Sequence, residues 1–176
     1  MSHVFLIGFM GAGKSTVGRI LADRLGLPFV DLDSEITHSA GRTITEIFDA
    51  EGEQGFRSRE TAALASLADI PASVVACGGG VVLIDENRRL LKRTGVVVYL
   101  KVSAEEAIAR IGDTTGRPLL AHGDAAHMAA TLLATRETLY GTVADAVVDT
   151  GGLTPERVAE GAFEAIAPIH PGGVPS

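Results

Sequence analysis

The chain has 176 residues, of which 46% are hydrophobic, and its formal net charge is −7. This length and composition predict one domain with an ordinary hydrophobic core, which we place at residues 1–167, followed by a flexible tail at residues 168–176. The acidic balance argues against a broad nucleic-acid-binding face and against an anionic membrane surface as a partner.

Three further features predict a cytoplasmic protein. No apolar run approaches the ~20 residues that span a bilayer, so no membrane association is expected. The beginning of the chain lacks the basic and apolar regions of a signal peptide. The single cysteine, Cys77, leaves no partner for an internal disulfide, which is typical of a reducing compartment.

Residues 8–16, GFMGAGKST, carry the most specific pattern. They fit G-x-x-x-x-G-K-[ST], the phosphate-binding loop, between a β-favouring apolar run at residues 4–7 and a helical pattern that ends at Gly26. Backbone N–H groups of such a loop bind phosphate at the positive end of the helix. A glycine-rich turn that binds nothing is the alternative, but this context favours a nucleotide. The predicted ATP-binding residues of the loop are Gly11, Ala12, Gly13, Lys14, Ser15 and Thr16.

A second short strand at residues 27–33 ends in two acids, Asp31 and Asp33. Side chains two residues apart lie on the same side of a strand, so both carboxylates can face the crevice at its C-terminal end. One carboxylate would then join a Mg²⁺ shell, and the other would accept a hydrogen bond from a substrate hydroxyl. The alternative is that Asp33 caps a helix.

Residues 34–67 have a helical pattern that is interrupted at Gly41 and Gly52. Arg57 and Glu60 lie three residues apart in it and can pair on one helix face. The alternative to a functional Arg57 is therefore a surface ion pair, which contributes little to stability.

A third buried strand at residues 73–77 ends in the glycine run 78–80. Three consecutive glycines are reasonable where the backbone approaches a ligand closely, and a flexible turn is the alternative. A helix follows at residues 85–93, a fourth strand at 96–100 and a helix at 103–111.

The polar loop at about residues 112–124 can move over a site, and Arg117 is a positive charge within it. The alternative is an exposed loop with a solvated arginine. The pattern then predicts a helix at residues 125–140, a fifth strand at 146–149 and a last helix at 154–166.

Five short apolar strands that alternate with helices predict an α/β fold, a parallel sheet covered by helices on both faces. Ligands of such sheets bind at the carboxyl ends of the strands. The phosphate loop, the acid pair and the glycine run all follow strand ends, so we expect one site that takes a nucleotide, a metal ion and a second small molecule.

These motifs together resemble the shikimate kinase family, over nearly the whole chain. Apart from the phosphate loop each motif is weak alone, but their order and spacing make the set specific. The matching segments are the loop at residues 8–18, D-x-D at 31–33, G-E-x-x-F-R-x-x-E within 51–60, the glycine run at 78–80, R-P-L of a lid at 117–119 and R-x-x-L-Y at 136–140.

The resemblance implies a three-layer P-loop kinase fold with a mobile lid. It also implies the reaction: the γ-phosphoryl group of ATP passes to the 3-hydroxyl of shikimate, in aromatic amino-acid biosynthesis, with Mg²⁺ as cofactor. The expected partners are these two small molecules, and the expected oligomeric state is a monomer.

For the acceptor, the resemblance implies that Asp33 binds the shikimate hydroxyls, as a catalytic base or as a positioning group. Arg57 and Arg136 would hold the carboxylate. Gly79 and Gly80 would bring the backbone to the ring.

For ATP, the resemblance implies that Lys14 and a catalytic Arg117 contact the phosphates, with Arg110 along the adenine. Ser15 would bind Mg²⁺ directly and Asp31 through water. Family members often carry an arginine after the fifth strand, whereas residues 151–153 here are Gly-Gly-Leu. Contacts to the base are therefore expected from the backbone or from Pro155.

Two rival interpretations stay open at the level of sequence. Another small-molecule kinase of similar shape, for gluconate or a nucleoside monophosphate, would share the phosphate loop but need a different acceptor pocket. A regulatory ATP-binding protein without chemistry would have no need of the acidic and basic residues that the motifs retain.

Overall fold

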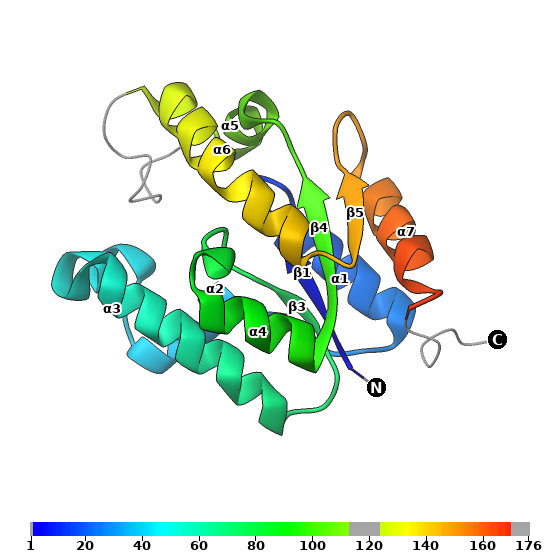
Figure 1. Cartoon of the computed structure of the whole chain (residues 1–176), viewed down its shortest axis with the longest axis horizontal. Helices are drawn as coiled ribbons and strands as arrows, with labels where there is room; N and C mark the ends of the chain where they lie inside the picture. The colour runs from blue at the N-terminus through cyan, green and yellow to red at the C-terminus, as the bar shows by residue number, and fades with distance from the viewer. Residues whose placement is uncertain (1, 113–123, 170–176) are drawn as a thin grey trace.

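Five short parallel strands form one sheet at the centre of the computed structural model, which describes residues 2–112 and 124–169 (Figure 1). The strand order is β2-β3-β1-β4-β5, and each neighbouring pair is parallel. The strands are β1 (His3–Ile7), β2 (Phe29–Asp31), β3 (Val74–Ala76), β4 (Gly95–Lys101) and β5 (Ala146–Asp149).

The middle strand β1 explains the apolar sequence at the start of the chain. All five of its residues are buried, and Val4 is aligned with Val74 of β3 on one side and Val96 of β4 on the other. A strand that is paired on both edges and covered on both faces requires a continuous apolar run rather than an alternating one. Because all neighbouring strands are parallel, their carboxyl ends lie at the same edge of the sheet.

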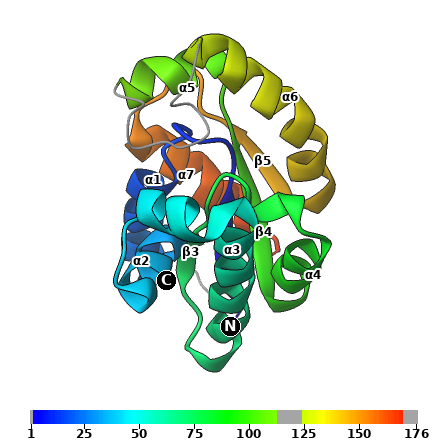
Figure 2. The same ribbon diagram turned by 90° about the vertical axis from the view of Figure 1, so that its left-hand side faces the viewer.

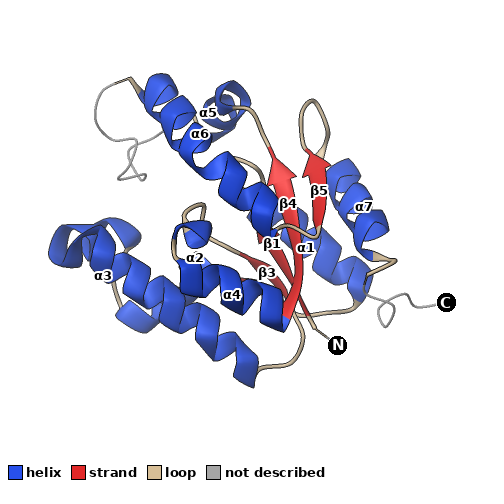
Figure 3. Ribbon diagram, in the orientation of Figure 1, coloured by secondary structure: helices blue, strands red, loops and turns tan. Residues whose placement is uncertain are grey.

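Helices cover both faces, which confirms the predicted three-layer fold (Figure 3). On one face α1 (Lys14–Leu25) packs against α7 (Pro155–Ile166). On the other, α4 (Asp85–Thr94) and α6 (Ala125–Val143) contact β4 and each other. The short helix α5 (Ala104–Ile111) packs against α6.

Beyond β3, the helices α2 (Leu32–Ala40) and α3 (Ile44–Ser66) lie side by side (Figure 2). As predicted, α2 ends at Gly41, which is left-handed with φ of 62°. Gly52 has φ of 69° and ψ of −179°, so α3 is bent there into two helical halves. None of the described helices has the length and apolar character needed to cross a membrane.

The predicted strand over residues 27–33 is wrong at its end. Strand β2 stops at Asp31, because the Asp31 side chain accepts a hydrogen bond from the Ser34 N–H at 3.2 Å and so caps α2. Asp33 therefore lies in the first turn of a helix and not two residues along a strand. The sequence pattern also missed two short 3₁₀ turns, Leu67–Asp69 and Val81–Leu83.

Candidate active site

The loop between β1 and α1 is held in its curled shape by its own lysine. Lys14 Nζ donates to the carbonyl oxygens of Gly8 and Phe9, both at 2.9 Å. Gly11 and Gly13 adopt φ of 79° and 88°, which side chains other than hydrogen rarely allow. The helix α1 begins at Lys14, so the positive end of its dipole points at the concave side of the loop.

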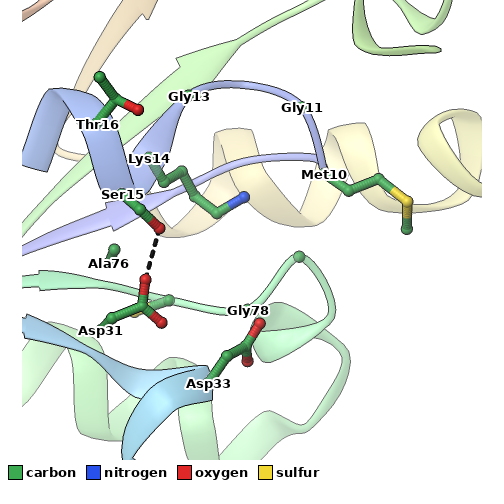
Figure 4. A pocket seen from close by; sticks show the side chains of 12 residues that line it. Met10, Gly11, Gly13, Lys14, Ser15, Thr16, Asp31, Asp33, Ala76 and Gly78 are labelled. Atoms are coloured by element: carbon green, nitrogen blue, oxygen red, sulfur yellow. Dashed lines mark hydrogen bonds between the residues drawn. The ribbon is translucent and has the colours of Figure 1, made fainter. Parts of the chain in front are cut away.

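A cavity of about 210 Å³ lies at the carboxyl ends of β1, β2 and β3, and Figure 4 shows its lining. The phosphate loop lines one side. Asp31 and Asp33 line the other, together with Cys77, Gly78 and Gly79. The phosphate loop, the acid pair and the glycine run thus lie at one cavity, as expected from their positions after strand ends. Asp33 reaches this cavity from α2.

Ser15 and Asp31 meet within this cavity (Figure 4). Ser15 Oγ donates to Asp31 Oδ2 at 2.5 Å. Within the described residues, no group of three His, Cys, Asp or Glu side chains could hold a metal ion. Because Mg²⁺ keeps several waters and is held by one or two protein oxygens plus substrate phosphates, a hydroxyl and a carboxylate beside the phosphate loop suit it.

Arg57 and Glu60 form a buried ion pair, so the surface-pair interpretation of Arg57 is wrong. Arg57 Nη1 lies 2.9 Å from Glu60 Oε2, and the two side chains are 9% and 0% exposed. Burial raises the pKa of the Glu60 carboxyl to about 7; the charges of Arg57 and, more weakly, Arg136 act to lower it, and that of Asp33 raises it further. Glu53 also pairs with Arg57, at 3.2 Å.

The glycine run is where these charged side chains touch the backbone. A Cβ on Gly78 would lie 2.8 Å from Asp33 Oδ1 and 2.9 Å from Glu60 Oε1. A Cβ on Gly80 would lie 2.2 Å from Arg57 Nη2. Two carboxylates and a guanidinium therefore lie directly against this short segment, and a side chain at either position would displace them.

Helix α6 contacts the same segment. Arg136, only 3% exposed, donates from Nη1 to the Gly79 carbonyl at 3.4 Å. The Tyr140 hydroxyl donates to the same carbonyl oxygen. Arg57 and Arg136 thus approach one backbone segment from two different helices.

A second cavity, of about 550 Å³, lies on the α7 side of the phosphate loop. Arg110 lines it and is held in place by Thr150, whose Oγ1 and carbonyl oxygen accept from Arg110 at 3.0 Å and 2.8 Å. Leu153 and Pro155 supply apolar surface. This arrangement could hold a nucleotide base on the far side of the loop from the acids.

Comparison with known proteins gives a consistent family assignment. The family model for shikimate kinase matches residues 10–167. The chain is 44% identical over 171 residues to a shikimate kinase from Pseudomonas savastanoi, covering 97% of this chain and 99% of that protein. A solved structure of a shikimate kinase from Acinetobacter baumannii in complex with shikimate matches with a TM-score of 0.93 and 40% identity, covering 96% of this chain and 94% of that one.

The chain belongs to the shikimate kinase family. The predictions of the family, of the fold and of an ATP-dependent kinase that uses shikimate are thereby confirmed. A gluconokinase from Sinorhizobium meliloti, which matches with a TM-score of 0.63 at 21% identity over 96% of this chain and 93% of that one, shares only the fold.

Two residues at the shikimate kinase site went unassigned in the sequence analysis, Glu60 and Tyr140. Each is the last residue of a motif that was used for the family resemblance, so position within the motif was the available signal. Cys77 is buried, and burial raises the pKa of its thiol. Arg117 and most of the predicted lid lie outside the described residues.

Proposed function

We propose that this chain phosphorylates the 3-hydroxyl of shikimate with ATP through the residues gathered at the edge of the sheet. The observation that carries the proposal is that one cavity joins the phosphate loop to Asp33, with Arg57 and Arg136 at the glycine run beside it. A triphosphate and a small hydroxylated carboxylate would therefore meet end to end.

On the ATP side, Lys14 and the loop N–H groups would hold the β- and γ-phosphates, with the base in the cavity along Arg110. Ser15 would hold Mg²⁺ directly and Asp31 through water, and the bound ion would neutralise charge on the transferring phosphoryl group. Arg117 would add a further positive charge at the phosphates.

On the acceptor side, two guanidinium groups suit one carboxylate, because arginine binds planar carboxylates through paired hydrogen bonds. Arg57 and Arg136 would divide this task, while Asp33 would accept from the ring hydroxyls. Gly79 and Gly80 would let the ring lie against the backbone. Asp33 lines the cavity across from the phosphate loop, which suits a group that binds the reacting hydroxyl.

We further propose that residues 1–167 act as one catalytic domain with a lid at about 112–124, and that residues 168–176 are a tail without a catalytic part. The acidic charge and the lone buried cysteine support a cytoplasmic monomer.

The test is ADP release with Mg-ATP and shikimate, gluconate, AMP or CMP, each offered alone. Turnover with shikimate and none with the other three is the expected result. Turnover with gluconate or a nucleotide instead would keep the phosphate-loop chemistry and overturn the roles of Arg57 and Arg136. ATP binding without turnover on any acceptor would favour a regulatory protein.

A further inference from the structure

The Tyr140 hydroxyl is buried at the acceptor side of the site, although the mechanism gives it no chemical part. Tyr140 is 0% exposed, and its hydroxyl donates to the carbonyl oxygen of Gly79. Burial raises the pKa of this hydroxyl, so it stays protonated and acts as a hydrogen-bond donor across the physiological range.

This one hydrogen bond determines where the neighbouring peptide group points. A peptide bond is planar and trans, so the N–H of Gly80 points away from the carbonyl of Gly79. Anchoring that carbonyl towards α6 therefore directs the Gly80 N–H away from α6. Gly80 cannot be fixed by a side chain of its own, because Arg57 occupies the space where a Cβ would lie.

The same hydrogen bond affects Arg136. Its Nη1 reaches the Gly79 carbonyl at 3.4 Å, near the outer limit of a hydrogen bond. That oxygen has two lone pairs and accepts from both groups, and Arg136 also hydrogen-bonds the Tyr140 hydroxyl, so Tyr140 and the Gly79 carbonyl together fix the place of the guanidinium. The guanidinium, which has five N–H donors, keeps the others for a ligand carboxylate.

We propose that Tyr140 is a positioning residue for the phosphoryl acceptor: its hydroxyl anchors the Gly79 carbonyl and thereby sets the Gly79–Gly80 peptide and the Arg136 guanidinium in the geometry that receives shikimate. This inference rests on the proposed function. It adds a residue that does not touch the reacting atoms but sets the affinity of the acceptor site.

The neighbouring Tyr99 offers a matched control. Its ring stacks on that of Tyr140, with centroids 5.0 Å apart and an interplanar angle of 25°. Tyr99 is 3% exposed, and among the described residues its hydroxyl has no hydrogen-bond partner. Replacing either tyrosine by Phe keeps the ring stack, so the two variants differ in the contacts that the Tyr140 hydroxyl makes with Gly79 and Arg136.

The experiment compares Tyr140→Phe with Tyr99→Phe in steady-state kinetics with Mg-ATP and shikimate, and in calorimetric binding of shikimate to the enzyme without nucleotide. Tyr140→Phe should raise both the KM and the Kd for shikimate by about three- to ten-fold, the effect of one hydrogen bond to a buried carbonyl. The KM for ATP and kcat should stay within about two-fold of the parent values. Tyr99→Phe should change none of these quantities.

Unchanged shikimate binding in Tyr140→Phe would overturn the positioning role, as would an equal change in Tyr99→Phe. Equal rises in the KM for shikimate and for ATP would indicate general loosening of the structure and would also contradict it. Absence of shikimate turnover in the parent enzyme would instead overturn the proposed function, so the two failures are distinguishable.

Discussion

Glu60 is a buried carboxyl whose protonation links the site to the stability of the fold. Its pKa rises from the ordinary glutamate value of 4.5 to about 7 in the folded chain, chiefly because burial disfavours the charged form. Between these values the folded state binds more protons than the unfolded state, so stability falls as pH rises. The Glu60 contribution is fully present below about pH 4.5 and is lost as pH rises through about 7, a loss of roughly 1–3 kcal/mol.

Thermal or urea unfolding at pH 5, 6, 7 and 8 measures this effect. The control is Glu60→Gln, which keeps an oxygen that can accept from Arg57 but does not ionise there. The free energy of unfolding of the parent, relative to Glu60→Gln, should decrease across this range. Parallel pH profiles for the two proteins would show that Glu60 does not change its charge between pH 5 and 8.

Asp33 and Asp31 line one cavity, but replacing each by asparagine should change different kinetic quantities. Asp33→Asn should lower kcat with shikimate by about 10²-fold or more, the usual effect of losing a general base. Asp31→Asn should raise the Mg²⁺ concentration needed for half-maximal rate and leave the KM for shikimate nearly unchanged. Both are measured by ADP release with Mg²⁺ and shikimate varied separately.

A fall of less than about ten-fold for Asp33→Asn would show that Asp33 positions the acceptor and is not a general base.

Asp33 was identified as a site residue from sequence, but by a geometric argument that the structure does not support. Alternation along a strand was to place Asp33 beside Asp31, whereas Asp33 belongs to a helix that Asp31 caps. The carboxylates converge because a helix starts at the strand end and turns the chain back over the site.

At the scale of elements, α3 bends at Gly52, in the same helix that carries Arg57. Gly52 adopts φ of 69°, and across the bend Glu51 accepts two hydrogen bonds from Arg59, at 2.9 Å and 2.8 Å. A Cβ on Gly55 would lie 2.4 Å from the Cβ of Glu51. Gly55 therefore gives Glu51 the room to fold over the helix.

Gly55→Ala should force Glu51 or the bend to move. We expect a loss of about 1–3 kcal/mol of stability, as for overpacked sites, and a rise in the KM for shikimate because Arg57 lies two residues further along the helix. The measurements are urea unfolding and steady-state kinetics. Gly141→Ala in α6 is the control, since nothing lies within 4 Å of its added Cβ; it should gain about 0.5–1 kcal/mol. Equal stability changes in the two variants would contradict the steric argument.

Elements with a regular apolar pattern could be predicted from sequence, and those set by local hydrogen bonds could not. The strand β1 follows from its apolar run, and the end of α2 at Gly41 and the bend of α3 at Gly52 follow from glycine positions. The turn at Val81–Leu83 forms through hydrogen bonds from Val81 to Gly78 and from Leu83 to Gly80, which leave no periodic signal.

At the scale of the whole molecule, the site depends on contacts between segments far apart in the sequence. Glu60 lies on α3 and Tyr140 on α6, and both meet the glycine run that follows β3. Sequence spacing carries no information about such long-range contacts, so family motifs were needed to assign Arg57 and Arg136 to the acceptor site. The phosphate loop is the exception, because its residues are consecutive and its geometry is local.

The last prediction concerns the assembly of the whole chain. Four large apolar side chains are more than 40% exposed among the described residues, and they come from different segments: Ile70, Val147, Leu153 and Ile169. Leu153 lines the cavity beside the phosphate loop rather than an outer face. Val147 lies on β5, a strand at the sheet edge that also exposes Asp149, and a charge on an edge strand opposes pairing with another chain.

We therefore expect a monomer with a mass of 18.2 kDa and a radius of gyration of about 16 Å. Light scattering after size exclusion and small-angle X-ray scattering measure these two values. The Tm should not depend on protein concentration, as it would for a dissociating dimer. A mass near twice this value would contradict the prediction, and Val147→Lys would then test β5 as the interface, because a charge there should restore the monomer if the strand edges pair.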